Sequence, residues 1–213
     1  GYLIYQMSTP RGGSFWFQGN VTVFNAYNGP TTGYVGANYN ATTGAGNIDV
    51  WMVTPKVAGG IIAGDSLYFW SRSTDLGTNY PDSIRVLYSV SDSTPSGTWT
   101  ELGRFRVVNP TPGAPNNGYQ LKGFRAPTAS ANGRFAIRYS VANGGPSGAN
   151  SDYIGIDALN IIRTSGPAST VFASLWCPAN TLPSLPAATY YQAAAWLGDT
   201  MYVQAPTTAG AGA

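Results

Sequence analysis

The stretch from 148 to 163 holds the side chains best suited to bind a cation. A polar loop, Gly-Ala-Asn-Ser-Asp, leads into an apolar segment whose residues alternate as in a strand with one apolar and one mixed face. Asp157 interrupts the mixed face, and a carboxylate in a mostly buried strand needs a partner. Two interpretations stay open. Asp157 holds a neighbouring loop by hydrogen bonds, which we favour, or it binds a structural Ca²⁺ with Asp152 or Asn150, since this cation prefers oxygen ligands.

The sequence does not favour catalytic chemistry. The chain has no histidine to act as a base, and no Gly-x-Ser-x-Gly motif accompanies its serines. A glycosidase needs two carboxyl groups either about 5 Å or about 6.5–9.5 Å apart. Several of the nine acidic residues stand in turn contexts instead, among them Asp65, Asp92 and Asp199. We therefore predict no catalytic residues and no enzyme.

Aromatic side chains offer a different chemistry, the stacking of sugar rings. The chain has six Trp, fourteen Tyr and eight Phe. Trp16, Trp51 and Trp70 lie in apolar strands, so we expect them in the core, where aromatic rings contribute large buried areas. The tyrosines in or beside loops are better placed for exposure and are the candidate ligand-binding residues: Tyr34, Tyr39 and Tyr80, with Tyr27 nearby.

Composition excludes several classes of protein. Only 9% of the residues are charged, against about 25% in ordinary globular domains. The net charge of +2 is spread thinly and no basic stripe is visible, so nucleic acid is not an expected partner. Cys177 is the only cysteine, which rules out a disulfide within the chain and a Cys/His zinc site. No apolar run approaches the roughly 20 residues of a membrane span, and Gly1 is expected to be a processed or trimmed end.

Short apolar segments separated by turn signals predict an all-β fold. We expect residues 1–163 to form a two-sheet antiparallel jelly-roll β-sandwich, without a helix longer than a turn or two. The clearest strands are 66–72 and 83–90, and further strands are expected near 49–53, 99–102, 104–108, 119–124, 133–140 and 153–162. The expected core residues are Trp51, Phe69, Val86, Ile137, Ile154 and Ile156.

An ordered set of motifs resembles bacterial choice-of-anchor J domains, relatives of the cleaved-adhesin and MAM-like jelly rolls. The match covers about residues 8–163, and its pieces are 14–20 with Phe24, 33–40, 51–55, 80–82 before 86–89, 135–139 and 148–157. The resemblance implies a secreted or surface-attached β-sandwich without catalytic activity. Members usually begin with a further strand that carries an acidic residue. Where related jelly rolls bind calcium, that acid shares the site with the residue matched here by Asp157, and the present chain lacks this strand or has had it removed.

The composition changes after residue 163. Residues 164–213 form a Pro/Ala/Gly-rich extension with a β-hairpin expected at 190–204, whose Gly-Asp loop suits a type II′ turn. Part of this extension resembles a single Kelch-type repeat. Its apolar side chains are expected to dock either on the chain's own sandwich or on the next copy of the chain, through Trp176, Tyr190, Trp196 and Tyr202.

Three functions remain open at this point. The first is a non-catalytic extracellular or cell-surface adhesion module that binds a surface or matrix component. The second is a self-assembling subunit of an extracellular fibre, joined by strand or tail exchange. The third is a carbohydrate-binding module that holds a glycan on its aromatic residues.

Overall fold

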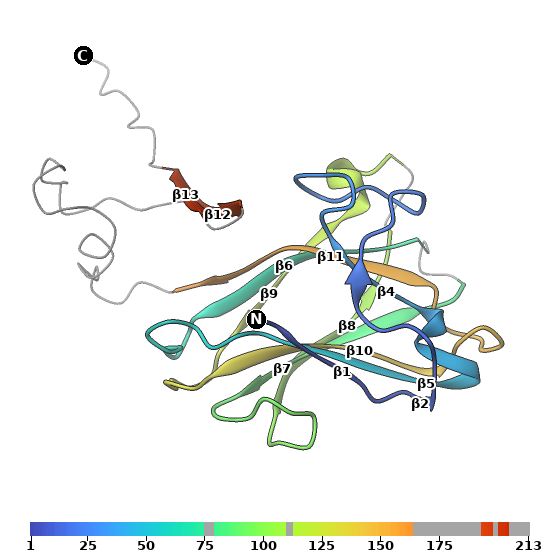
Figure 1. Ribbon diagram of the computed structural model, residues 1–213, viewed down its shortest axis with the longest axis horizontal. Helices are drawn as coiled ribbons and strands as arrows, with labels where there is room; N and C mark the ends of the chain where they lie inside the picture. The colour runs from blue at the N-terminus through green and yellow to red at the C-terminus, as the bar shows by residue number, and fades with distance from the viewer. Residues whose placement is uncertain (75–78, 110–112, 164–192, 198–199, 205–213) are drawn as a thin grey trace, which may run out of the picture. The chain divides into compact units, whose positions relative to one another are not determined.

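The computed structural model describes residues 1–74, 79–109, 113–163, 193–197 and 200–204. Residues 1–163 form an all-β sandwich of two antiparallel sheets, as predicted (Figure 1). Sheet I contains β1 (Leu3–Gln6), β5 (Thr42–Val53), β10 (Arg134–Gly144), β7 (Asp82–Ser89) and β8 (Thr100–Val107) in that spatial order, and β2 (Thr9–Arg11) also pairs with β5. The strands expected at 99–102 and 104–108 are therefore one strand, β8.

Sheet II faces sheet I and brings together segments from both ends of the domain. Its order is β3 (Phe17–Gln18), β4 (Val35–Asn38), β11 (Tyr153–Ile162), β6 (Ser66–Ser73) and β9 (Gln120–Arg125). Two short 3₁₀ turns, Tyr39–Ala41 and Pro115–Gly118, interrupt the strands. Among the described residues, no helix is long and apolar enough to cross a membrane.

The apolar core lies between the sheets, where alternate residues of each strand point inward. Five of the six expected core residues are there and fully or almost fully buried: Phe69, Val86, Ile137, Ile154 and Ile156. Burial of such side chains removes apolar surface from water at about 25 cal/mol per Å².

Two of the three tryptophans expected in this core face away from it. Trp51 is buried, but on the outer face of sheet I, beside Val53 and Leu87. Trp70 is only partly buried and lies on the outer face of sheet II, where its ring stacks on Tyr27 with centroids 4.0 Å apart. The prediction was wrong because alternation defines two faces of a strand without telling which one meets the other sheet. In this fold, loops cover part of both outer faces.

A β-bulge changes the faces of β11 halfway along its length. Asp157 pairs with Trp70 and Asn160 with Tyr68, so Ala158 and Leu159 together occupy the space opposite one residue of β6. Ala158 takes a positive φ of 48°. After the bulge, Leu159 and Ile161 pack on the core. The strict alternation expected from the sequence, which placed both residues on the face of Asp157, is therefore wrong.

Residues 166–213 form a second unit, separate from Gly1–Ser165. Within it, β12 (Ala193–Leu197) and β13 (Thr200–Gln204) pair as antiparallel strands. Of the four expected docking residues, Trp196 and Tyr202 lie on these strands. Trp176 and Tyr190 lie outside the described residues.

Candidate binding groove

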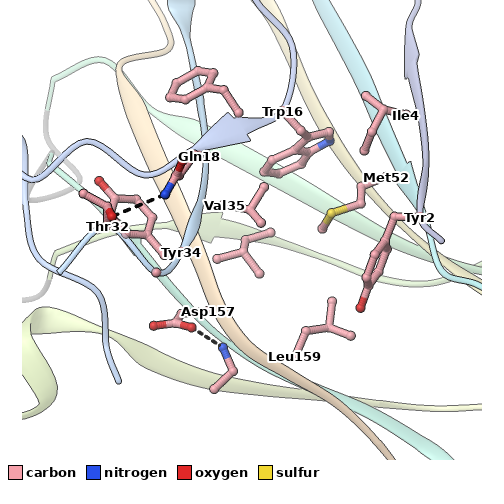
Figure 2. Close-up of a pocket in the computed structure, with 14 residues that line it drawn as sticks. Tyr2, Ile4, Trp16, Gln18, Thr32, Tyr34, Val35, Met52, Asp157 and Leu159 are labelled. Atoms are coloured by element: carbon pink, nitrogen blue, oxygen red, sulfur yellow. Dashed lines mark hydrogen bonds between the residues drawn. The ribbon is translucent and has the colours of Figure 1, made fainter. Parts of the chain in front are cut away.

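A groove of about 490 Å³ opens between the two sheets at the side where β1 and β4 lie. Sheet I contributes Tyr2, Ile4 and Met52, and sheet II contributes β3, β4 and the bulged part of β11. Figure 2 shows the ring of Tyr2 beside Leu159 and the side chain of Ile4 above Met52. The walls are mainly apolar, as in most sites that bind organic ligands.

The polar groups of the groove gather at one end. There the amide of Gln18 donates to Thr32 Oγ1 over 3.3 Å (Figure 2). Deeper in the groove, Trp16 is only 4% exposed, and its indole Nε1 has no hydrogen-bond partner among the described residues. A buried donor without an acceptor is costly in a folded protein.

Two strand edges border the groove. β4 pairs with β11 only from Tyr153 to Ile156, and no described strand pairs with the same side of β11 from Asp157 to Ile162. β1 pairs with β5 on one side only. The edge of a sheet presents backbone N–H and C=O groups that can pair with a further strand.

Asp157 lines the groove and anchors a loop. Its Oδ2 accepts a hydrogen bond of 3.0 Å from the backbone N–H of Asn28, 129 residues away, and its Oδ1 accepts one of 2.6 Å from Ala158. These two contacts fix the loop before β4 and the bulge of β11. This is the arrangement that the hydrogen-bond interpretation describes.

The structure does not bring the three proposed calcium ligands together. Asp152 precedes β11 and accepts a hydrogen bond from Thr74 Oγ1, while Asn150 donates to the carbonyl of Ala142. Five residues of extended chain, about 16 Å, separate Asp152 from Asp157. Within the described part of the chain, no three Asp, Glu, His or Cys side chains group around a possible metal position. A calcium ion on Asp157 would need other ligands and stays a prediction.

The buried carboxylate of Asp82 was not singled out by the sequence analysis. It is fully buried and accepts hydrogen bonds from Tyr139 (2.6 Å), Ser73 (2.9 Å) and the backbone N–H of Asp152 (3.1 Å). Burial raises the pKa of Asp82 to about 6, although these hydrogen bonds lower it. The polar network joins β6, β7 and β10, so its role is to hold the two sheets together.

The candidate ligand-binding tyrosines occupy different environments. Tyr34 is only 3% exposed, so its expected exposure was wrong: its ring stacks on Phe24, and its hydroxyl donates to the Asn20 carbonyl over 2.9 Å. It nevertheless lines the groove. Tyr39 and Tyr80 are 38% and 53% exposed, but neither lines the groove. A loop residue of this chain can be buried because other loops pack over the outer face of sheet II.

Comparisons with known proteins bear on the fold. No family model matches the chain, and no curated protein matches it. The K1 cleaved adhesin domain of Lys-gingipain from Porphyromonas gingivalis W83 is similar, with 18% identity over 77% of this chain and 91% of that domain, and a TM-score of 0.53. The K3 domain of the same protein has 18% identity over 76% and 91%, with a TM-score of 0.48. TmCBM61, solved with β-1,4-galactotriose, has 12% identity over 76% and 88%, with a TM-score of 0.45. The likeness to the K1 domain supports the jelly-roll sandwich.

Proposed function

We propose that this chain is a non-catalytic adhesion module of a secreted or surface-attached bacterial protein, of the choice-of-anchor J kind. Its ligand is an extended segment of a partner polypeptide at the cell surface or in the matrix. The observation that carries this proposal is the apolar groove between β1 and β11, bordered by two strand edges that have no neighbour among the described residues.

An extended polypeptide matches both properties of the groove. Its backbone can pair with the free side of β11 from Asp157 to Ile162, next to the end of β4. Every second side chain would then point into the apolar space around Trp16, Met52 and Leu159. Main-chain pairing supplies affinity in this mode of recognition, and the shape of the pocket supplies specificity.

The same groove does not favour catalysis. Among the described residues, Asp157 is the only carboxylate that lines it, and both oxygens of that carboxylate already accept backbone hydrogen bonds. Hydrolysis of a glycosidic bond needs two suitably spaced carboxyl groups. A binding role therefore fits the residues better than an enzymatic one, and the fold that the chain shares with an adhesin domain supports it.

Glycan binding is the second candidate function. The polar end of the groove carries the amide of Gln18 and the hydroxyl of Thr32, and Tyr2 provides aromatic surface elsewhere in the groove. A sugar ring needs both kinds of group, one to stack on and one to hydrogen-bond. The small polar area and the large apolar wall make this candidate weaker than the polypeptide.

A pair of leucine substitutions tests the proposal. Leu159→Glu places a charge in the groove, whereas Leu121→Glu makes the same change on the exposed side of β9, where the leucine is 51% exposed. The full chain would be used to select ten-residue peptides from a display library, and the selected peptides would be titrated by calorimetry. We expect Leu159→Glu to abolish binding and Leu121→Glu to retain it.

Other outcomes of this experiment separate the alternatives. In one outcome, light scattering shows that the particle mass of the unchanged chain increases with its concentration and that this increase is absent in Leu159→Glu. That result would identify a second copy of the chain as the occupant of the groove and would favour the fibre. Glycan-array binding lost in the same variant, with no peptide selected, would favour the carbohydrate-binding module. Peptides that bind both variants equally would show that the groove is not the site.

A further inference from the structure

The outer face of sheet I carries a row of arginines that the strand register assembles. Arg138 of β10 lies directly opposite Arg85 of β7, which in turn lies opposite Arg104 of β8. On the other side of Arg138, the same row continues through Trp51 of β5 to Tyr5 of β1. We call Arg138, Arg85 and Arg104 the arginine row. The sequence shows no basic stripe because the three residues are far apart along the chain.

This face carries an excess of positive charge. Arg106 lies on the next register position of β8, opposite Ser83, and is exposed. Arg134 lies two residues before Ala136 on β10 and therefore shares the outer face with Arg138. Two carboxylates accompany the five arginines: Asp49 binds Arg138, and Glu101 binds both Arg85 and Arg104. The five positive and two negative charges leave an excess of three positive charges on this face.

The carboxylates of this face do not balance its arginines. Like charges directly opposite each other on neighbouring strands are destabilising. Asp49 pairs with Arg138, and the single carboxylate of Glu101 serves both Arg85 and Arg104, at 3.3 and 3.6 Å. Among the described residues, Arg106 has no ion pair. A bound anion would therefore offset the positive charge that remains on this face.

The row is also held in place. The Nε and Nη2 atoms of Arg138 each donate to Asp49 over 2.7 Å, and its guanidinium carbon lies 4.8 Å from the centre of the Trp51 ring. These contacts use two of its five donors, and no described acceptor binds Nη1. Neighbouring strands lie about 4.8 Å apart, and this spacing separates the backbone positions of the three arginines across the sheet.

We propose that the arginine row is a second binding face, separate from the groove, and that it binds an acidic polysaccharide laid across the strands. The guanidinium fork pairs with the carboxylate or sulfate groups of such a polymer. Tyr5 and Trp99 are partly buried and pack beside the buried ring of Trp51. Their exposed parts provide apolar surface on which sugar rings can pack. Duplex nucleic acid carries one charge per about 1.7 Å, too dense to match a face on which two carboxylates offset part of the arginine charge.

The test uses two polymers with matched neutral forms and the full chain. Polygalacturonate is compared with its methyl ester, and dextran sulfate with dextran, by calorimetry at two salt concentrations. The double variant Arg104→Gln/Arg106→Gln removes two exposed cations from this face. The control Arg11→Gln/Arg125→Gln removes two exposed cations from β2 and β9 and changes the net charge equally.

We expect the acidic polymer to bind, its neutral form not to bind, and the first double variant to weaken binding by about tenfold. The control variant should bind as the unchanged chain does. If only polygalacturonate binds, carboxylates are the groups that the arginines recognise. If only dextran sulfate binds, sulfates are those groups. Equal losses in the two double variants, binding of a neutral form, equal binding of a duplex oligonucleotide, or no binding of either acidic polymer would overturn the proposal.

Discussion

Tyr139 donates a 2.6 Å hydrogen bond to the carboxylate of Asp82, and both side chains are completely buried. Tyr139 belongs to β10 in sheet I, while Ser73, the other side-chain donor to this carboxylate, ends β6 in sheet II. One acidic side chain thus connects the two sheets. Because burial opposes its ionisation, its protonation state is coupled to folding.

The first prediction concerns this coupling. Burial raises the pKa of Asp82 to about 6, whereas an unfolded Asp titrates near pH 3.9. Between about pH 4 and pH 6 the folded chain keeps a proton that the unfolded chain has lost. The contribution of Asp82 to stability should therefore fall as pH rises through this window, by on the order of 3 kcal/mol. Urea unfolding from pH 4 to pH 7 measures the slope.

The variant Asp82→Asn should flatten this slope, because the amide fills the same space without titrating. Leu121→Gln is the control, because this exposed side chain does not titrate and the substitution should leave the slope unchanged. If the Asp82→Asn chain keeps the full decrease between pH 4 and pH 6, another group is responsible for it.

The sequence predicted the sandwich more accurately than the surfaces that it presents. Phe69, Val86 and Ile137 lie in strands with clear alternation, and each points into the core as expected. The bulge of β11 leaves a signal that was missed: the core residues Ile154 and Ile156 are followed by Leu159 and Ile161, a step of three instead of two. Such a step is what one inserted residue produces.

The groove and the arginine row depend on information that a single strand does not contain. Arg85 and Arg138 become neighbours through the pairing of β7 with β10, which no local pattern specifies. Trp51 is apolar and buried as expected, but the loop that carries Trp99 covers it from outside the sandwich. Long-range register and loop packing decide these sites, so alternation and motif spacing did not reveal them.

A second prediction concerns a close approach on the outer face of sheet II. A methyl group added at Gly155 would lie 2.7 Å from Phe24 Cε2 and 2.9 Å from Tyr34 Cδ2. These two rings are stacked with centroids 5.0 Å apart. We expect Gly155→Ala to force them apart and to lower the free energy of unfolding by about 1–3 kcal/mol. Gly13→Ala, where a methyl group meets nothing within 4 Å, should not be destabilising.

The third prediction concerns the anchor at Asp157. In Asp157→Asn an amide NH₂ must face one of the two backbone N–H donors, so one hydrogen bond is lost. We expect faster hydrogen exchange at Asn28 and a loss of about 1 kcal/mol in stability. The same experiment tests calcium: an increase in melting temperature on addition of Ca²⁺ that disappears in Asp157→Asn would support the proposed cation. Unchanged exchange at Asn28 would contradict the anchoring role.

The fourth prediction separates the structural role of Arg138 from binding. Its two hydrogen bonds to Asp49 and its contact with Trp51 are partly buried, with 25% and 22% of the two charged side chains exposed. Arg138→Lys keeps the charge but loses the planar fork, so we expect a loss of about 1–2 kcal/mol in the free energy of unfolding. Arg106→Gln, which removes an exposed arginine with no recorded ion pair, should leave thermal denaturation unchanged. If the two variants have the same free energy of unfolding, the paired hydrogen bonds of the guanidinium group to Asp49 do not stabilise the fold.

The strand order has a consequence for how the domain is made. β4 and β6 lie in the first 73 residues, yet both pair with β11, which ends at Ile162. In sheet I, β5 and β7 likewise pair with β10, which is synthesised after both of them. A chain that emerges from the ribosome N-terminus first therefore cannot complete the centre of either sheet until β10 and β11 are released. Folding of the sandwich is then a slow step that waits for these two strands, and until then β5 and β6 have exposed edges that a chaperone can bind.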